Sequence, residues 1–228
     1  MKTTLPILLL CFSLSVTFAQ KDSISNIGFS FGAGSNFINM SELNERLEMY
    51  NYPLLSKKRL YLSYSIKLYG FPASEMIMEG SYYGSFQKET KNSYKLNFEH
   101  NALYFNYGYD ILNKKKLNLY PVLGLGYSAV NIKITDISST NNTFNQAISN
   151  LDNIADISTT ENMFLLNIGL KLELLEYTIF GISNSTGLDI GYRIQLNKMR
   201  WKTATNQLFD SPEINLGGFY IGLEIIFE

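Results

Sequence analysis

Cysteine is almost absent from this sequence. The 228 residues contain a single cysteine, Cys11. It lies in an N-terminal apolar stretch that we expect to be cleaved, so the mature chain would carry no thiol. This excludes a fold held together by disulfides and a metal site built on cysteine ligands.

Charge is also scarce, and neither sign dominates. Charged residues make up 17% of the chain, against roughly 25% in ordinary soluble domains. The 19 Lys and Arg balance 20 Asp and Glu, which excludes the basic field of a nucleic-acid-binding protein. Mean hydropathy is −0.04, which argues against a helical membrane protein. The 16 Tyr, 15 Phe and 16 Gly suit a β-protein whose outer surface is apolar.

The N-terminus has the layout of a secretory signal peptide. Lys2 gives a positive start, an apolar stretch follows, and small residues occupy the −3 and −1 positions of a cleavage after Ala19. The apolar stretch is shorter than the roughly 20 residues of a membrane-spanning helix. A lipid anchor on Cys11 would need a small residue before it, where this chain has Leu10. We therefore expect a cleaved signal peptide at 1–19.

Eight segments of the mature chain alternate between apolar residues and polar or small ones. They are 27–34, 60–69, 76–86, 103–110, 117–128, 164–173, 188–196 and 218–227. Side chains on a strand point to opposite faces in turn, so each segment has one apolar face. Each is about as long as the roughly 9–11 residues with which a tilted strand crosses a bilayer. A lipid-facing sheet must close, because an open edge would leave backbone groups unpaired in hydrocarbon.

The connections between these segments alternate in length. The odd ones, at 38–59, 88–95, 135–161 and 197–213, are longer than those at 70–75 and 113–116, while 175–186 is apolar and could extend a strand. Membrane barrels have short periplasmic turns and long outer loops. The sequence therefore predicts an all-β fold over residues 20–228, an eight-stranded antiparallel up-and-down transmembrane β-barrel.

A short helix is predicted in the first long connection. Ser41 can cap a helix that runs through Tyr50, with Leu43 and Leu47 on the same face as Tyr50, and Pro53 ends it. We expect this helix to pack on the barrel rim. The alternative is a recognition element for an extracellular partner.

The polar faces carry charges of both signs. The residues concerned are Lys67, Glu79, Lys171, Glu173, Asp189, Arg193 and Glu224. Lys67 and Glu79 lie equally far from a turn, so they should be cross-strand partners. Eight strands enclose a space that side chains can fill, and an unpaired charge there is costly. We therefore expect a structural plug of paired charges rather than a pore lining or a proton path.

The overall pattern and the last strand resemble a known class of proteins. The signal peptide, the eight alternating segments, the loop asymmetry and the ending GGFYIGLEIIFE are similar to small OmpA/OmpX-like outer-membrane barrels, especially the PorT-like outer membrane protein beta-barrel domain family. Five residues of the ending resemble the C-terminal signal read by the barrel-assembly machinery: Phe219, Ile221, Leu223, Ile225 and Phe227.

This resemblance implies an integral protein of the outer membrane of a Gram-negative bacterium, with a structural, adhesive or assembly role. Its expected partners are outer-membrane lipid, the barrel-assembly machinery during biogenesis, and an extracellular protein or glycan at the long loops. A closed eight-stranded barrel can work as a monomer. The resemblance supplies no catalytic residue, and we expect no cofactor.

Two other functions remain open. A soluble secreted barrel resembling the lipocalins would carry a small apolar ligand inside, with its charged faces outward. A barrel that modifies lipid A would need a catalytic histidine, and the chain has one, His100, which Ser85 or Ser128 could approach in space. A lone inward histidine is more often structural, and we find no hydrolase, zinc-protease, nucleotide-binding or calcium-binding motif, so we expect no enzyme and no metal site.

Overall fold

The computed structural model describes residues 26–70, 75–112, 114, 117–136, 154–159, 163–179, 182–198, 200–202 and 212–227. The expected signal peptide at 1–19 lies outside the described residues. Among the helices in these ranges, none is long and apolar enough to span a membrane.

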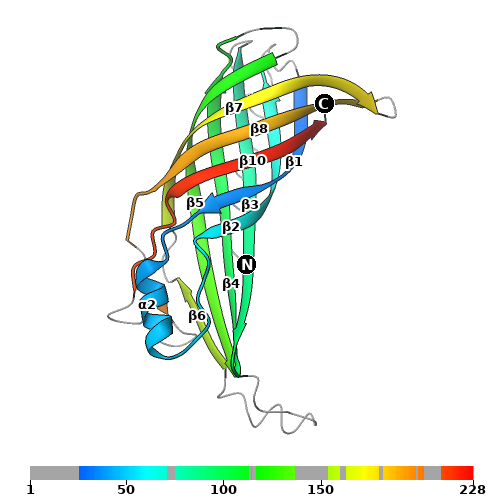
Figure 1. The fold of residues 1–228 in the computed structure, drawn as a ribbon. Helices are drawn as coiled ribbons and strands as arrows, with labels where there is room; N and C mark the ends of the chain where they lie inside the picture. Colours follow the sequence, from blue (N-terminus) through cyan, green and yellow to red (C-terminus); the bar gives the residue numbers. More distant parts are fainter. Residues whose placement is uncertain are drawn as a thin grey trace.

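Eight antiparallel strands form a closed ring in the described part of the chain (Figure 1). They are β1 (Asn26–Phe37), β2 (Lys58–Tyr69), β3 (Met76–Lys91), β4 (Tyr94–Tyr109), β5 (Leu117–Asp136), β7 (Met163–Ile179), β8 (Ile182–Gln195) and β10 (Gly218–Phe227). Each pairs with its neighbours in chain order, and β1 closes the ring on β10, with Phe29 opposite Phe227 and Asn36 opposite Tyr220. The predicted up-and-down barrel is confirmed.

The apolar faces of these strands point outward. Phe29, Leu60, Leu125 and Leu223 are 56%, 73%, 61% and 62% exposed, although all are large apolar side chains. The residues between them along the strands point inward and are polar or small. The assignment of the two faces is therefore confirmed, and the outward residues form a continuous belt of exposed apolar side chains around the barrel.

Several strands are longer than the sequence predicts. β3 and β4 have 16 residues each, β5 has 20 and β7 has 17, against an expected 9–11 or so. The prediction of a loop at 88–95 is wrong, because β3 and β4 continue until only Asn92 and Ser93 connect them. Asn92 has a φ of 55°, a left-handed conformation that asparagine tolerates. Figure 1 shows β3, β4 and β5 running past the other strands at this end.

The other odd connections contain short strands. β6 (Ile154–Thr159) pairs with the extended part of β5, and β9 (Trp201–Lys202) pairs with β6. The apolar sixth connection does extend its strands, since β7 reaches Ile179 and β8 starts at Ile182. These additions all enlarge the sheet, because strand pairing satisfies backbone groups that a loop would leave to water.

The helix in the first connection is present as α2 (Ser41–Met49). Leu43 and Leu47 are buried as predicted, but Tyr50 is 68% exposed, which corrects its placement on the buried face. Ser41 does not cap the helix. Instead, the Asn39 side-chain Oδ1 accepts hydrogen bonds from the Ser41 backbone N–H and hydroxyl, at 3.1 and 2.9 Å.

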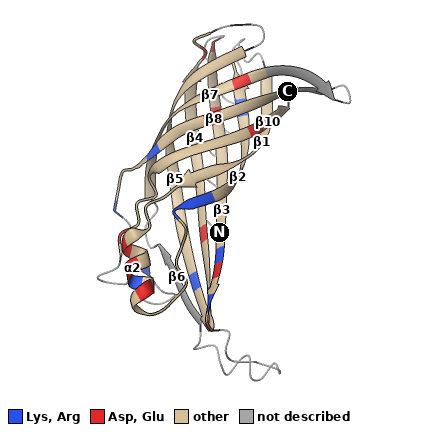
Figure 2. Ribbon diagram, in the orientation of Figure 1, with Lys and Arg blue, Asp and Glu red and all other residues tan. Residues whose placement is uncertain are grey.

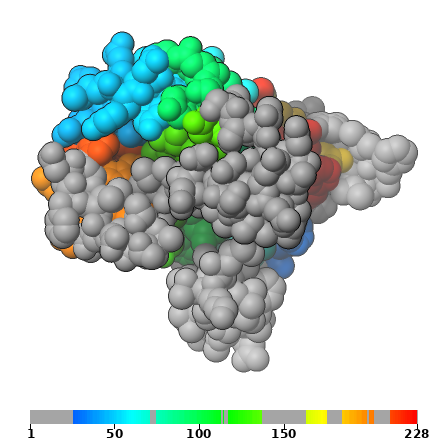
Figure 3. All heavy atoms as spheres, turned by 90° about the horizontal axis from the view of Figure 1, so that it is seen from below, coloured from blue at the N-terminus to red at the C-terminus, as the bar shows by residue number. Residues whose placement is uncertain are grey.

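We refer to α2, β6, β9 and the protruding parts of β3, β4 and β5 as the cap. Figure 3 looks onto it, with the cyan atoms of the β1–β2 connection lying against green atoms of the β3–β4 hairpin, where Tyr52 and Tyr94 make an edge-to-face contact at 4.9 Å. The cap lies opposite the end that carries both termini, because β1 starts and β10 finishes at that other end.

Replacing Gly126 by valine is expected to hinder barrel formation. A Cβ at Gly126 would overlap the ring of Tyr104 on β4, which is buried and packs edge-to-face on Tyr83 at 5.1 Å. Overpacking of this kind costs about 1–3 kcal/mol. The folded fraction, measured by migration of unheated samples on a gel, should fall. Leu125→Val, at a 61% exposed outward position, is the control, and equal folded fractions for both variants would contradict the packing argument.

Candidate functional site

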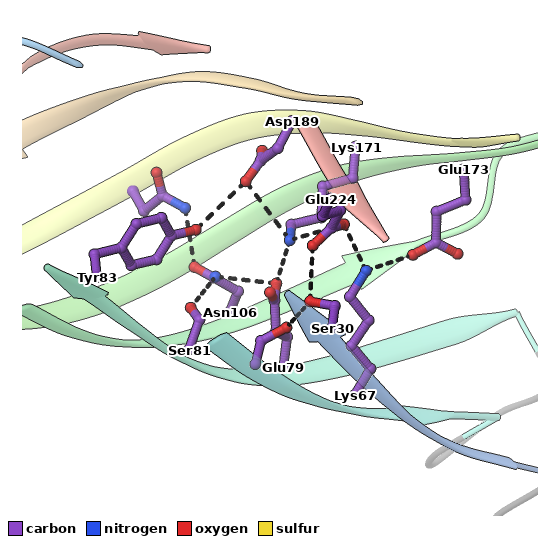
Figure 4. A network of polar contacts seen from close by, with 12 residues as sticks. Ser30, Lys67, Glu79, Ser81, Tyr83, Asn106, Lys171, Glu173, Asp189 and Glu224 are labelled. Carbon is purple, nitrogen blue, oxygen red and sulfur yellow. Dashed lines mark hydrogen bonds and ion pairs between the residues drawn. The ribbon is translucent and has the colours of Figure 1, made fainter. Parts of the chain in front are cut away.

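The middle of the barrel interior is occupied by charged side chains (Figure 4). They reach inward from β2, β3, β7, β8 and β10, because every second residue of a strand faces the same side. Lys67 and Lys171 are 0% and 1% exposed, and each is surrounded by carboxylates. We refer to Lys67, Glu79, Lys171, Glu173, Asp189 and Glu224 as the ionic layer.

Each lysine pairs with more than one carboxylate. Lys67 Nζ lies 2.8 Å from Glu173 Oε1 and 2.6 Å from Glu224 Oε1. Lys171 Nζ lies 2.6 Å from Glu79 Oε2, 3.6 Å from Asp189 Oδ2 and 3.7 Å from Glu224 Oε1. Glu224 therefore joins the two lysines into one connected cluster.

Neutral donors satisfy the remaining carboxylate oxygens. The Ser30 hydroxyl donates to Glu224 Oε2 at 3.0 Å, and the Tyr69 hydroxyl donates to Glu173 Oε1 at 3.2 Å. Asn106 Nδ2 donates to Glu79 Oε2 at 3.3 Å, and the Tyr220 hydroxyl donates to Asp189 Oδ1 at 3.2 Å. Buried ion pairs need these extra hydrogen bonds, because the attraction between the charges alone scarcely offsets their desolvation.

The expected pairing of Lys67 with Glu79 needs a correction. The two residues are opposite each other in the β2–β3 register, as the sequence indicates. Their ion pairs, however, reach across the barrel: Lys67 bonds to carboxylates on β7 and β10, and Glu79 bonds to Lys171 on β7. The strongly curved wall of a small barrel brings inward side chains of distant strands together.

Arg193 lies apart from these ion pairs, in a cage of tyrosine rings. Its guanidinium carbon is 5.6, 4.4, 4.7 and 4.4 Å from the ring centroids of Tyr61, Tyr83, Tyr104 and Tyr220. Aromatic faces attract a cation, and more so where water is excluded. The sequence places Arg193 in the interior, but it does not reveal this cage.

Arg59 is an interior cation that the sequence interpretation missed. It is 3% exposed, and its guanidinium carbon lies 3.5 Å above the ring of Phe98. The interpretation ended the first connection at Arg59, but β2 starts at Lys58 and the alternation already includes this residue. Arg59, Tyr61, Ser63, Ser65 and Lys67 share one parity, which is the signal that could have found it.

The buried charges of the barrel wall balance in number. The four cations are Arg59, Lys67, Lys171 and Arg193, and the four carboxylates are Glu79, Glu173, Asp189 and Glu224. In the described part of the chain, no group of three or more potential ligand side chains is arranged to hold a metal ion. The arrangement can therefore fill the barrel and hold its wall strands together.

Apolar side chains lie between the ionic layer and each end of the barrel. On the cap side, Leu96, Phe98, Val130 and Ile132 of β4 and β5 face inward and are 2% exposed or less. Ile38, Met40, Leu43, Leu47, Leu55, Trp201, Ile214 and Leu216 from the connections belong to the same cluster. On the side of the termini, Ile77, Tyr120 and Val122 form a smaller cluster.

His100 lies inside the barrel beside Ser128. Its Nε2 is 2.7 Å from the Ser128 hydroxyl oxygen, and the two residues are 2% and 0% exposed. Ser85, the other serine considered, faces His100 across the β3–β4 register. A histidine within hydrogen-bonding reach of a serine is one element of a hydrolase site. This pair, however, faces the closed interior rather than the lipid-facing belt.

The five residues of the predicted assembly signal all face outward on β10. Phe219, Ile221, Leu223, Ile225 and Phe227 are 39–62% exposed, and together they form part of the apolar belt. Their neighbours on the same strand face inward, including Glu224 of the ionic layer.

No protein-family model matches this chain, and no curated protein matches it. Among solved structures, it is similar to Ail, the attachment invasion locus protein of Yersinia pestis (12% identity, 88% of this chain and 97% of that one, TM-score 0.47). It is also similar to a major outer membrane protein of Thermus thermophilus (12%, 89% and 100%, TM-score 0.49) and to Neisserial surface protein A (11%, 90% and 99%, TM-score 0.46). Likeness at this level says nothing about function, and the barrel assignment rests on the strand pairing described above.

Replacing Lys171 by methionine is expected to destabilise the barrel strongly. The change removes the cation that Glu79, Asp189 and Glu224 share, and breaking a buried pair in this way costs about 3–5 kcal/mol. Urea unfolding in lipid vesicles, followed by gel migration, would measure the loss. The double variant Lys171→Met with Glu79→Gln should recover part of it.

The matched control is Lys198→Met, which breaks the exposed ion pair with Glu213 at 3.1 Å. Exposed pairs of this kind contribute about 1 kcal/mol or less. Equal losses in the Lys171 and Lys198 variants would contradict a stabilising role for the ionic layer.

Proposed function

We propose that this protein is an integral outer-membrane barrel of a Gram-negative bacterium, and that its filled barrel anchors a folded cap for interactions at the cell surface. The observation that carries the proposal is the combination of an outward apolar belt with a charged, closed interior. A barrel in water would expose its charges and bury its apolar faces, whereas a barrel in lipid needs the reverse.

The placement of the two faces argues against a lipocalin-like carrier. Such a carrier would hold an apolar ligand against inward apolar side chains in the middle of the barrel. Here that space contains Lys67, Lys171 and their carboxylates. The exposed side chains of Phe31, Leu62 and Ile168 would meanwhile face water without cover.

The same interior argues against a role in transport. Both lysines of the ionic layer are inaccessible, and apolar clusters lie on either side of them. Opening a path would leave charges unpaired in a confined space, at a cost of several kcal/mol each.

Surface interaction is favoured by the cap. A polar cleft of about 490 Å³ opens between α2 and the segment that leads into β10. Its amide side chains bond to the chain itself: Gln195 Oε1 accepts from the Leu216 N–H, and Asn215 Oδ1 from the Gly217 N–H, each at 2.8 Å. The cleft is therefore preformed, and the charged side chains along it are left for a partner. They are Glu42, Glu45, Lys198 and Glu213.

Membrane fractionation with unheated and boiled gel samples tests this proposal. We expect the protein in the outer-membrane fraction, a shift in migration on boiling, and no steady conductance in a planar bilayer. A soluble periplasmic protein without a shift would contradict the membrane barrel. A stable conductance would contradict the anchoring role while leaving the barrel intact.

A lipid-modifying enzyme is the second candidate, because His100 and Ser128 are in contact. We expect His100→Ala and Ser128→Ala to leave the lipid A profile of expressing cells unchanged, since lipid cannot reach a pair that faces the closed interior. Mass spectrometry of extracted lipid A would measure this, with cells lacking the protein as the reference. A modified species that requires both residues would reverse this conclusion.

A further inference from the structure

Three lysines gather on the outward face of the cap, beyond the apolar belt. The β3–β4 register sets Lys88 opposite Asn97 and Thr90 opposite Lys95, and the β4–β5 register sets Asn97 opposite Lys133. Lys88 and Lys133 therefore flank Asn97 at roughly 10 Å from each other, and Lys95 is diagonal to both. We refer to these three lysines as the lysine patch.

The parity of the strands shows that the patch faces away from the barrel interior. The alternate residues Leu96, Phe98, Ile132 and Ile134 are buried inside the cap. Lys88 is exposed, while Lys95 and Lys133 are partly exposed. Figure 2 shows charged residues on the protruding part of the long strands, below the wide tan area of the barrel.

No carboxylate of the described residues forms an ion pair with the lysine patch. The ammonium groups also lie close to one another, and the proximity of Lys88, followed by that of Lys133, lowers the pKa of Lys95. Like charges held this close on a rigid sheet repel each other, so an anion that bridges them would relieve the repulsion.

The height of the patch indicates which anion fits. On β3, Lys88 is two residues past the exposed Phe86, and on β5, Lys133 is six residues past Tyr127 at the edge of the belt. With about 3.3 Å per residue and a tilt of about 40°, the lysines lie roughly 5 to 20 Å beyond the apolar belt. Phospholipid headgroups extend only about 5–8 Å on each side of the hydrocarbon.

We propose that the lysine patch binds the phosphorylated saccharide headgroup of a glycolipid in the outer leaflet. Such a headgroup is tall enough to reach all three lysines, and it carries phosphates for the ammonium groups. Asn97, Thr90 and Thr135 lie between the lysines and can bond to saccharide hydroxyls. The inference rests on the proposed outer-membrane location, and it names a lipid that the barrel would hold there.

Binding of fluorescent lipopolysaccharide with a phosphorylated core to the full mature chain in detergent tests the proposal. Each lysine near an anionic headgroup contributes about fivefold in affinity. The triple variant K88Q/K95Q/K133Q should therefore bind about 100-fold more weakly than the unchanged protein. The matched control K114Q/K115Q/K116Q removes the same charge between β4 and β5 at the other end, and it should bind normally. Replacing the three patch lysines by arginine should preserve binding.

Two competing probes separate the sources of phosphate. Phosphatidylglycerol and inorganic pyrophosphate should each displace the lipopolysaccharide poorly. Effective displacement by phosphatidylglycerol would overturn the choice of a tall saccharide headgroup, and effective displacement by pyrophosphate would indicate a free-anion site. Unchanged binding in the triple patch variant would overturn the proposal.

The boiling shift of each variant, measured on the same samples, distinguishes the failure of this inference from other causes. A variant that keeps its shift but loses binding has lost the patch and not the fold. If the unchanged protein itself lacks a shift and is soluble, the proposed outer-membrane function fails, whatever binds to the lysines.

Discussion

The rest of this structure depends on the closure of β1 onto β10. Hydrocarbon offers no hydrogen-bond partner, so a sheet in lipid is stable only if its first and last strands pair along their length. The pairing from Phe29 with Phe227 to Asn36 with Tyr220 supplies this closure. Once the ring is closed, every outward side chain must suit lipid, and every inward side chain must fit a space shared by eight strands. The alternation of the sequence is the record of that division.

The interior solves an electrostatic problem that closure creates. Inward polar residues are screened from water on all sides, so each charge needs an opposite charge and each polar atom a partner. The ionic layer meets this need through Glu224, which joins Lys67 and Lys171, and Arg193 meets it with tyrosine faces. Both solutions bring together residues from strands that are far apart in the sequence. The interior therefore also couples distant parts of the wall.

The sequence reveals faces better than partners. Period two alone assigns Lys67 and Glu79 to the inside, because parity along a strand is a local property. Their partners Glu173, Glu224 and Lys171 depend on how far each strand tilts and how strongly the wall curves, which no local pattern encodes.

The cap was missed for a related reason. Apolar residues on β4 fall at Leu96 and Phe98 and then at Leu103 and Phe105, so the apolar parity changes between His100 and Leu103. Read as loop, the first pair signals nothing; read as strand, it signals that the apolar face has turned from lipid to the protein interior.

That change of parity connects the two halves of the molecule physically. In the bilayer, lipid covers the outward apolar face, and the inside can be polar because its charges pair. Beyond the bilayer, water covers the outside, so the protruding strands carry polar residues outward and need apolar cover within. The connections supply this cover with Met40, Leu43, Leu47 and Trp201, all of which are 6% exposed or less. A barrel whose strands simply ended at the membrane would have no use for these side chains. Their burial argues that the extension is a folded platform carried by the barrel, and that the filled interior serves to hold it rigidly.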